Sequence, residues 1–151
     1  MACEKVFLER LRERGLRLTP QREMVLAVMH ELEGLATAEE VYEQVRTQTL
    51  AVDISTVYRT LDLLQRLGIV ACLNSPTDGQ YRYELLGVHG PHIHLVCRSC
   101  GAVLGVALDE AEAFAEKLET THGFVADVDH LSIEGLCHEC AKRMQEAAES
   151  D

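Results

Sequence analysis

The sequence has no long apolar run, since its longest apolar stretches are only a few residues. A transmembrane helix needs about 20. The N-terminus lacks the charged-then-apolar layout of a signal peptide, and no low-complexity segment is present. The length of 151 residues is enough for one ordinary domain or two small ones, and a hydrophobic fraction of 47% allows a core to form. We therefore expect a folded cytoplasmic protein with no membrane partner.

Positive charge is also scarce, with 14 Lys and Arg against 25 Asp and Glu and a net charge of -11. The imbalance is uneven, because residues 1–86 carry 10 basic and 13 acidic side chains and residues 87–151 carry 4 and 12. The first 22 residues hold six basic side chains against three acidic ones. A DNA duplex meets a local basic face and not the net charge, so the acidic total does not exclude DNA binding.

The first half of the chain predicts helices followed by a β-hairpin. We expect helices over residues 4–14, after Thr19, after Thr37 with Glu40 in a capping box, and from Asp53 or Ser55. Apolar residues at positions 54, 57, 61 and 64 give the last of these helices one buried stripe. Strands over 69–74 and 80–85 flank a turn-rich loop. This is the layout of a winged helix-turn-helix.

The second half predicts a small α/β domain. We expect strands over about 93–97 and 102–107, a helix over about 109–121, a strand over 124–135 and a last helix from His138. The buried face of the first of these helices is predicted to hold Ala111, Phe114, Ala115 and Leu118. The predicted class is α+β, with a winged-helix domain over 1–86, a linker over 87–91, an α/β domain over 92–142 and a frayed tail over 143–151.

Two Cys-x-x-Cys pairs, Cys97 with Cys100 and Cys137 with Cys140, form the strongest motif. Six cysteines in a cytoplasmic chain do not favour a disulfide framework. The two-residue gap lets both thiolates of a pair reach one tetrahedral Zn²⁺ at about 2.3 Å, and four thiolates leave no open position for catalysis. A redox dithiol is the alternative for one pair, but two pairs favour a structural Zn²⁺.

His92 and His94 lie five and three residues before the first of these cysteines. Residues i and i+2 of a strand share a face, so both imidazoles can reach one ion. Glu84 ends the hairpin just before the linker, so a site of Glu84, His92 and His94 would bridge the domains. An ion there could fix the relative orientation of the domains and act as a regulator. The alternative is that the histidines are exposed polar residues at a sheet edge.

Polar residues occupy the start of the fourth helix, in the stretch 54–61 (ISTVYRTL). Backbone amides there can meet a phosphate, Thr56 and Tyr58 can contact thymine methyl groups, and Arg59 can reach guanine or phosphate. Ser55 belongs to the same polar face. The alternative is an ordinary solvated helix face.

Five stretches together resemble the ferric uptake regulator family, and the resemblance covers about residues 11–140. They are 15–22 (GLRLTPQR), 37–42 (TAEEVY), 55–61 (STVYRTL), 92–101 (HIHLVCRSCG) and 135–140 (GLCHEC). The resemblance implies a homodimeric repressor of metal-uptake or stress genes, with a C-terminal dimerisation domain, that binds a palindromic DNA operator when its regulatory metal site is filled. It also implies that Tyr58 and Arg59 read bases and that Arg17 reaches the minor groove. Glu84, His92 and His94 are then the regulatory ligands.

The chain departs from the family pattern at two frequent metal ligands, because Leu35 stands where a His is common and Gly105 where an Asp or Glu is common. The remaining nitrogen-rich set suits Zn²⁺ better than an octahedral ion, with Fe²⁺ and Mn²⁺ as alternatives. Zinc sensors of the family often have Cys where this chain has Glu84. Cys72 is a candidate fourth ligand, although a buried small hydrophobe is the other interpretation.

A further metal site found in some members is incomplete in this chain. Pro91, Ile93 and Asp129 occupy ligand positions of that site, with His130 adjacent to the last. Only Glu112 matches.

Other classes of function are less consistent with the sequence. A peroxide-sensing regulator of the same fold would need an oxygen-rich site, which Leu35 and Gly105 do not supply. A metallohydrolase would need a general base and a pocket, and the chain has no His-Glu-x-x-His or nucleophile motif. A zinc-stapled interaction domain without a DNA role would not need Tyr58 and Arg59. We therefore expect no enzyme and no small organic ligand.

Overall fold

The computed structural model describes residues 2–86, 92–128 and 131–150, and for residues 2–4, 6 and 7 it describes the backbone alone. The chain divides into two compact units, Met1–Leu73 with Tyr81–Val88 and Asn74–Gln80 with His89–Asp151. No helix within the described ranges has the length and apolar character to cross a membrane.

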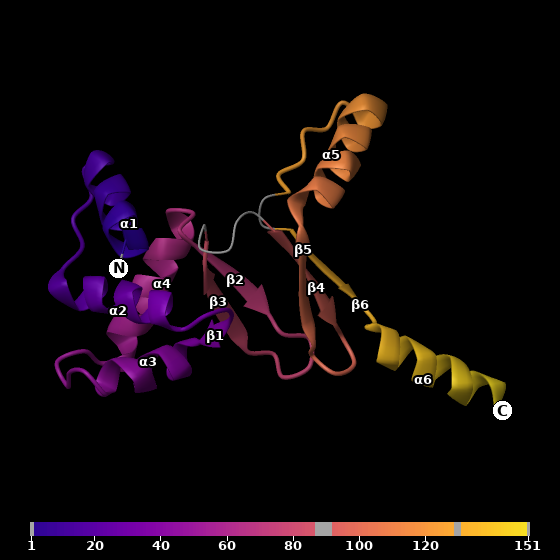
Figure 1. Ribbon diagram of the computed structural model, residues 1–151, viewed down its shortest axis with the longest axis horizontal. Coiled ribbons are helices and arrows are strands. Elements are labelled where there is room, and N and C mark those ends of the chain that lie inside the picture. The colour runs from indigo at the N-terminus through magenta and orange to yellow at the C-terminus, as the bar shows by residue number, and fades with distance from the viewer. Residues whose placement is uncertain (1, 87–91, 129–130, 151) are drawn as a thin grey trace. The chain divides into compact units, whose positions relative to one another are not determined.

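The first unit has four helices, of which the last three begin directly after the predicted caps and the first begins at Ala2, two residues before its predicted start. They are α1 (Ala2–Glu13), α2 (Pro20–Glu31), α3 (Ala38–Arg46) and α4 (Ile54–Arg66) (Figure 1). Thr37 caps α3 through a full capping box, in which the Glu40 amide donates to Thr37 Oγ1 at 3.2 Å and the Thr37 amide donates to Glu40 Oε2 at 2.8 Å. Asp53, and not Ser55, caps α4, because its Oδ1 accepts from the Thr56 amide at 2.8 Å.

The predicted hairpin of the first unit is confirmed as β2 (Val70–Asn74) and β3 (Tyr81–Leu85). A third strand, β1 (Ala36–Thr37), pairs antiparallel with β3 and completes a sheet of order β1-β3-β2. The sequence did not predict β1, because two residues carry no periodicity. Gly68 follows Leu67, the C-cap residue of α4, and has a φ of +71°, a left-handed conformation that favours glycine.

The core of the first unit leaves one face of α4 at the surface. Val57, Leu61 and Leu64 are fully buried against α2 and α3, within a cluster of seventeen buried side chains among the described residues. Each such side chain contributes about 1.5–3 kcal/mol on burial. This packing fixes the rotation of α4 about its axis, so that the polar side chains of its first turns face away from the core.

The second unit has a three-stranded sheet of order β5-β4-β6, formed by β4 (His92–Cys97), β5 (Val103–Ala107) and β6 (Ser132–Gly135). β5 runs antiparallel and β6 parallel to β4. The helix α5 (Leu108–His122) packs on the sheet through a small core of Ile93, Ala111 and Val128. The helix α6 (His138–Glu149) follows β6 and extends away from the sheet (Figure 1).

Three predictions for the second unit differ from the structure. Of the strand expected over 124–135, the described residues form β6 alone, because β6 pairs with β4 over four residues and 124–128 have no such partner. Phe114 is 53% exposed, because the three-stranded sheet covers only the stripe of α5 that holds Ala111 and Ala115. The tail expected to fray over 143–151 is helical as far as Glu149. The predicted linker, 87–91, lies outside the described residues.

Candidate functional site

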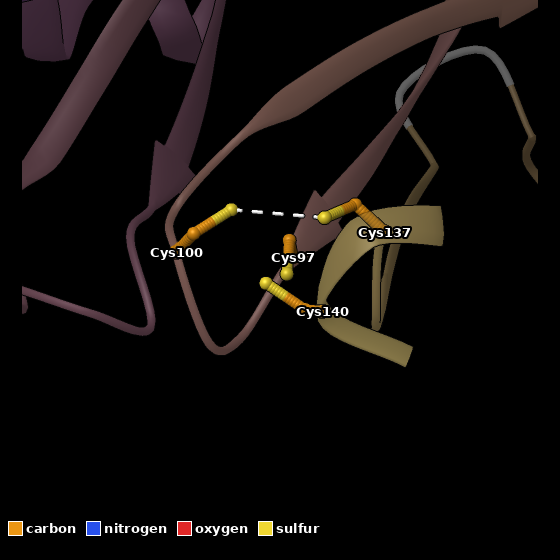
Figure 2. A group of neighbouring side chains, drawn as sticks. All are labelled: Cys97, Cys100, Cys137 and Cys140. Atoms are coloured by element: carbon orange, nitrogen blue, oxygen red, sulfur yellow. Dashed lines mark hydrogen bonds between the residues drawn. The ribbon is translucent and has the colours of Figure 1, made fainter. Parts of the chain in front are cut away.

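The four cysteines of the two pairs converge in the second unit. Cys97 ends β4, Cys100 lies in the turn that follows, Cys137 is the N-cap residue of α6 and Cys140 lies in its first turn. Their sulfur atoms all lie within 4.8 Å of one another. Figure 2 shows the four side chains directed toward a common centre. The parallel pairing of Cys97 with Gly135 brings the two halves of this cluster together.

The sulfur spacing fits a tetrahedral metal ion. Cys100 Sγ and Cys137 Sγ are 3.8 Å apart. Four sulfurs at about 2.3 Å from one Zn²⁺ lie about 3.8 Å from each other, whereas a disulfide brings two sulfurs to about 2.05 Å. A donor set of four thiolates suits Zn²⁺. The cluster therefore has the composition and dimensions of a closed zinc site.

The surroundings of the cluster favour the charged thiolate form of Cys97 and disfavour that of Cys100. The backbone amides of Cys137 and Cys100 lower the pKa of Cys97 from 9.0 to about 6. The Ala102 amide lowers the pKa of Cys100, but hydrogen bonding with the neighbouring cysteines and desolvation outweigh it and raise the pKa of Cys100 to about 11. A cation at the centre would favour the thiolate form of all four cysteines. Arg143 Nη2, which the sequence did not single out, also donates to Cys140 Sγ at 3.3 Å.

The two predicted regulatory histidines lie together on β4. Their ring centroids are 4.8 Å apart with an interplanar angle of 77°, and His94 is buried while His92 is half-buried. Gly105 pairs with His94 across the sheet, and a Cβ at Gly105 would meet His92 Cδ2 at 3.5 Å, an ordinary contact. Glu84 is buried on β3 in the first unit. A site that joins it to the histidines remains a prediction.

The two other ligand candidates gain no support. Cys72 lies on β2, where the Tyr83 hydroxyl donates to its sulfur, and burial raises the pKa of the Cys72 thiol. Burial likewise raises the pKa of Tyr83 to about 12. Glu112 is exposed on α5. The clusters able to hold a metal within the described part of the chain include neither Cys72 nor Glu112. Two other positions of the incomplete site, Pro91 and Asp129, lie outside the described residues, as does His130 beside them.

The predicted DNA-reading side chains lie at the surface of the first unit. Ser55, Tyr58 and Arg59 are exposed near the start of α4, and Thr56 is half-buried beside them. Arg17 is exposed in the segment between α1 and α2. The spacing of 55, 58 and 59 places those three residues on one side of the helix. Their use in DNA recognition remains a prediction.

Hydrogen bonds hold both predicted base-reading side chains. Arg59 donates to the Ser55 hydroxyl at 3.1 Å and to the Ser55 carbonyl at 3.3 Å. Ser55 in turn donates to Asp53 Oδ1 at 2.9 Å. Tyr58 donates from its hydroxyl to Glu39 Oε1 on α3. The sequence did not indicate a role for Glu39, because its only signal is a place beside the capping residue Glu40.

The chain is similar to curated regulators over most of its length, and residues 13–134 match the model of the "Ferric uptake regulator family". It is 37% identical over 127 residues to a "Zinc uptake regulation protein" of Mycobacterium tuberculosis, covering 83% of this chain and 95% of that protein. It is 38% identical over 135 residues to a "Ferric uptake regulation protein" of Bacillus subtilis, covering 87% and 90%. It is 31% identical over 142 residues to the "Peroxide operon regulator" of the same species, covering 92% and 94%.

Solved structures show the same similarity. The Helicobacter pylori ferric uptake regulator Fur, described with three functional metal binding sites, superimposes with a TM-score of 0.71 at 25% identity over 91% of this chain and 93% of that one. A zinc uptake regulator complexed with zinc and DNA superimposes with a TM-score of 0.62 at 25% identity over 95% and 96%. The predicted class, mixed α and β with a winged helix-turn-helix, is confirmed. The chain belongs to the ferric uptake regulator family, whose members are metal-responsive transcription regulators and not enzymes.

Proposed function

We propose that this protein is a homodimeric repressor that binds a palindromic DNA operator when zinc fills a regulatory site formed by Glu84, His92 and His94. The observation that carries the proposal is the pair of adjoining imidazoles on β4. The same strand ends in Cys97 of the four-cysteine cluster. One strand thus carries residues of two candidate metal sites, which supports a regulatory ion distinct from the structural one.

The cysteine cluster would hold the structural zinc ion. Four thiolates complete the tetrahedral coordination of Zn²⁺, so no position remains for an effector or a substrate. The ion would join the turn after β4 to the start of α6. Since Cys140 is the buried residue of α6, the attachment of this helix to its unit depends on the cluster. This ion should therefore stay bound while the regulatory ion exchanges.

A second copy of the chain would cover the part of the β5-β4-β6 sheet that α5 leaves exposed. An apolar hollow of about 600 Å³ lies at the sheet, lined by side chains that include Leu95, Val103, Leu104 and Ile133. Leu104 is 60% and Ile133 46% exposed. Contiguous exposed apolar surface of this kind marks an interface. Because the apolar core of this unit is small, covering this surface would stabilise the unit. This supports the predicted dimerisation domain.

Zinc is the proposed regulatory ion because the ligand set is small and rich in nitrogen. Gly105, which pairs with His94, supplies no carboxylate at the position where an octahedral iron or manganese site would need one. The same shortage of oxygen ligands disfavours a peroxide sensor, which needs bound iron. The 37% identity to a zinc uptake regulation protein supports zinc further.

The test compares DNA binding by the wild-type protein and by His92→Ala. A duplex of about 30 base pairs, enough for two half-sites, is selected from a random pool by the zinc-loaded protein and labelled for fluorescence anisotropy. Added zinc should tighten binding by the wild-type protein and leave His92→Ala unchanged, while both retain one zinc per chain in the cysteine cluster. If His92→Ala loses all its zinc and unfolds, the division into structural and regulatory sites is wrong.

A further inference from the structure

The carboxylate of Glu39 lies against the DNA-reading face of α4. Glu39 is in the first turn of α3, next to Glu40, whose own carboxylate is committed to the capping box. Glu39 Oε1 accepts a hydrogen bond from the Tyr58 hydroxyl. Tyr58 is 44% exposed, so its ring lies at the surface while its hydroxyl is fixed by a neighbouring helix.

The hydrogen bond restricts how Tyr58 can move. A tyrosine has two side-chain torsions, and anchoring the far end of the ring to a second helix restricts both of them. The Tyr58 side chain is therefore fixed in one conformation when the protein folds, before it contacts DNA. Side chains held in their binding conformation lose less entropy on association, and they contact only partners that match that conformation.

The charge of Glu39 acts in a second way. Phosphate groups dominate sequence-independent binding to DNA, and a carboxylate near the binding face repels them. A residue that weakens generic contacts and supports one specific contact increases the difference between operator and other DNA. Asp53, which accepts from Ser55 and so holds Arg59 indirectly, places a second carboxylate at the start of the same helix.

We propose that Glu39 is a positioning residue that determines DNA specificity: it holds Tyr58 ready for base contact and repels DNA that offers only phosphate contacts. This proposal rests on the proposed function, because it requires that α4 reads DNA. It assigns to the stretch 37–42 a role in recognition in addition to helix capping.

The chain offers a matched control in Glu43. It lies four residues after Glu39 on α3, is also exposed, and therefore lies on the same side of the helix. Glu43→Ala and Glu39→Ala remove the same charge, but only Glu39→Ala removes the acceptor of the Tyr58 hydroxyl. Glu39→Gln removes the charge and keeps an oxygen that can accept, so it should restore the positioning effect.

The experiment measures the affinity of the zinc-loaded, full-length dimer for the selected duplex and for a shuffled duplex of the same length and composition, at fixed salt. Glu39→Ala should lower the ratio of the two affinities by about fivefold, the factor that one net hydrogen bond is worth. Glu39→Gln should lower this affinity ratio less than Glu39→Ala does, and Glu43→Ala should lower it least of the three. Circular dichroism verifies that each variant is folded.

A double-mutant cycle with Tyr58→Phe isolates the positioning effect. The ring remains in Tyr58→Phe but the hydroxyl is gone, so adding Glu39→Ala should then change the ratio no more than Glu43→Ala does. An equal effect of Glu39→Ala with and without the hydroxyl would overturn the proposal, as would equal effects of Glu39→Ala and Glu43→Ala. If the wild-type protein does not distinguish the two duplexes, the proposed function itself fails.

Discussion

Replacement of Cys137 by serine should release α6 and destabilise the second unit while the first unit stays folded. Apart from cysteines, the buried apolar side chains in the described part of the second unit are Ile93, Val96, Ala111 and Val128. At about 1.5–3 kcal/mol for the isoleucine and each valine and about 0.8 kcal/mol for the alanine, they supply roughly 5–10 kcal/mol before chain entropy is subtracted. A structural zinc ion contributes about 10–16 kcal/mol in small zinc domains at neutral pH. The bound metal should therefore stabilise this unit more than its apolar core does.

The effect should be most visible in α6. A helix of 12 residues is marginal in isolation, and the described part of α6 buries Cys140 alone. Without the cluster its amides should exchange like those of a free peptide, at least about 100-fold faster than in the wild-type protein. The first unit should keep its protection, because its seventeen-residue cluster does not depend on the metal.

Hydrogen exchange with mass spectrometry measures both effects in one sample, with zinc content determined in parallel. Cys72→Ser is the matched control, because Cys72 lies on β2 and a serine oxygen can also accept from Tyr83. The expected result is fast exchange over residues 138–149 in Cys137→Ser and normal exchange in Cys72→Ser. Full zinc content with protected amides in α6 of Cys137→Ser would refute the structural role of the cluster.

Three other predictions concern the remaining sites. Arg59→Ala should weaken binding of the selected duplex by about 5–150-fold, the range of one bidentate base contact, without lowering the thermal unfolding temperature, because Arg59 is exposed; unchanged affinity would exclude α4 as the reading helix. Gly105→Asp should place an oxygen ligand opposite His94 and raise affinity for Mn²⁺ relative to Zn²⁺, and unchanged relative affinities in a metal titration would contradict this. At pH 8 zinc should displace a proton from Cys100, whose pKa is raised to about 11, and none from Cys97, whose pKa is lowered to about 6. The affinity of the cysteine cluster for zinc should therefore fall as the pH falls, and more steeply below about pH 6, where Cys97 must also lose a proton. Calorimetry in buffers of different ionisation enthalpy counts the protons released on zinc binding. Equal proton counts at pH 8 and pH 5 would contradict the assignment.

Local signals predicted most of the helices correctly. The capping box at Thr37 and the N-cap at Thr19 involve residues three apart, so the sequence contains the whole interaction. The four cysteines were also predictable as a group, because zinc coordination requires few residue types at narrow spacing. Their convergence is confirmed by the sulfur spacing.

Features that depend on distant partners could not be predicted in the same way. β1 exists because β3 offers it a pairing edge, and residues 124–128 form no strand because β4 pairs only with β6 on that side. The exposure of Phe114 depends on the width of the sheet under α5. The bond from Tyr58 to Glu39 joins residues 19 apart and depends on the crossing of α3 and α4. None of these follows from periodicity.

The central claim is that a metal ion at the histidine pair controls DNA binding. It is tested most directly by titrating protein that retains only its structural zinc with Mn²⁺, Fe²⁺, Ni²⁺ or Zn²⁺ and measuring affinity for the selected duplex at each concentration. Zinc should act at the lowest concentration and raise the affinity about 5–150-fold, the usual range of coupling between two sites. An affinity for DNA that no added metal changes would contradict the account.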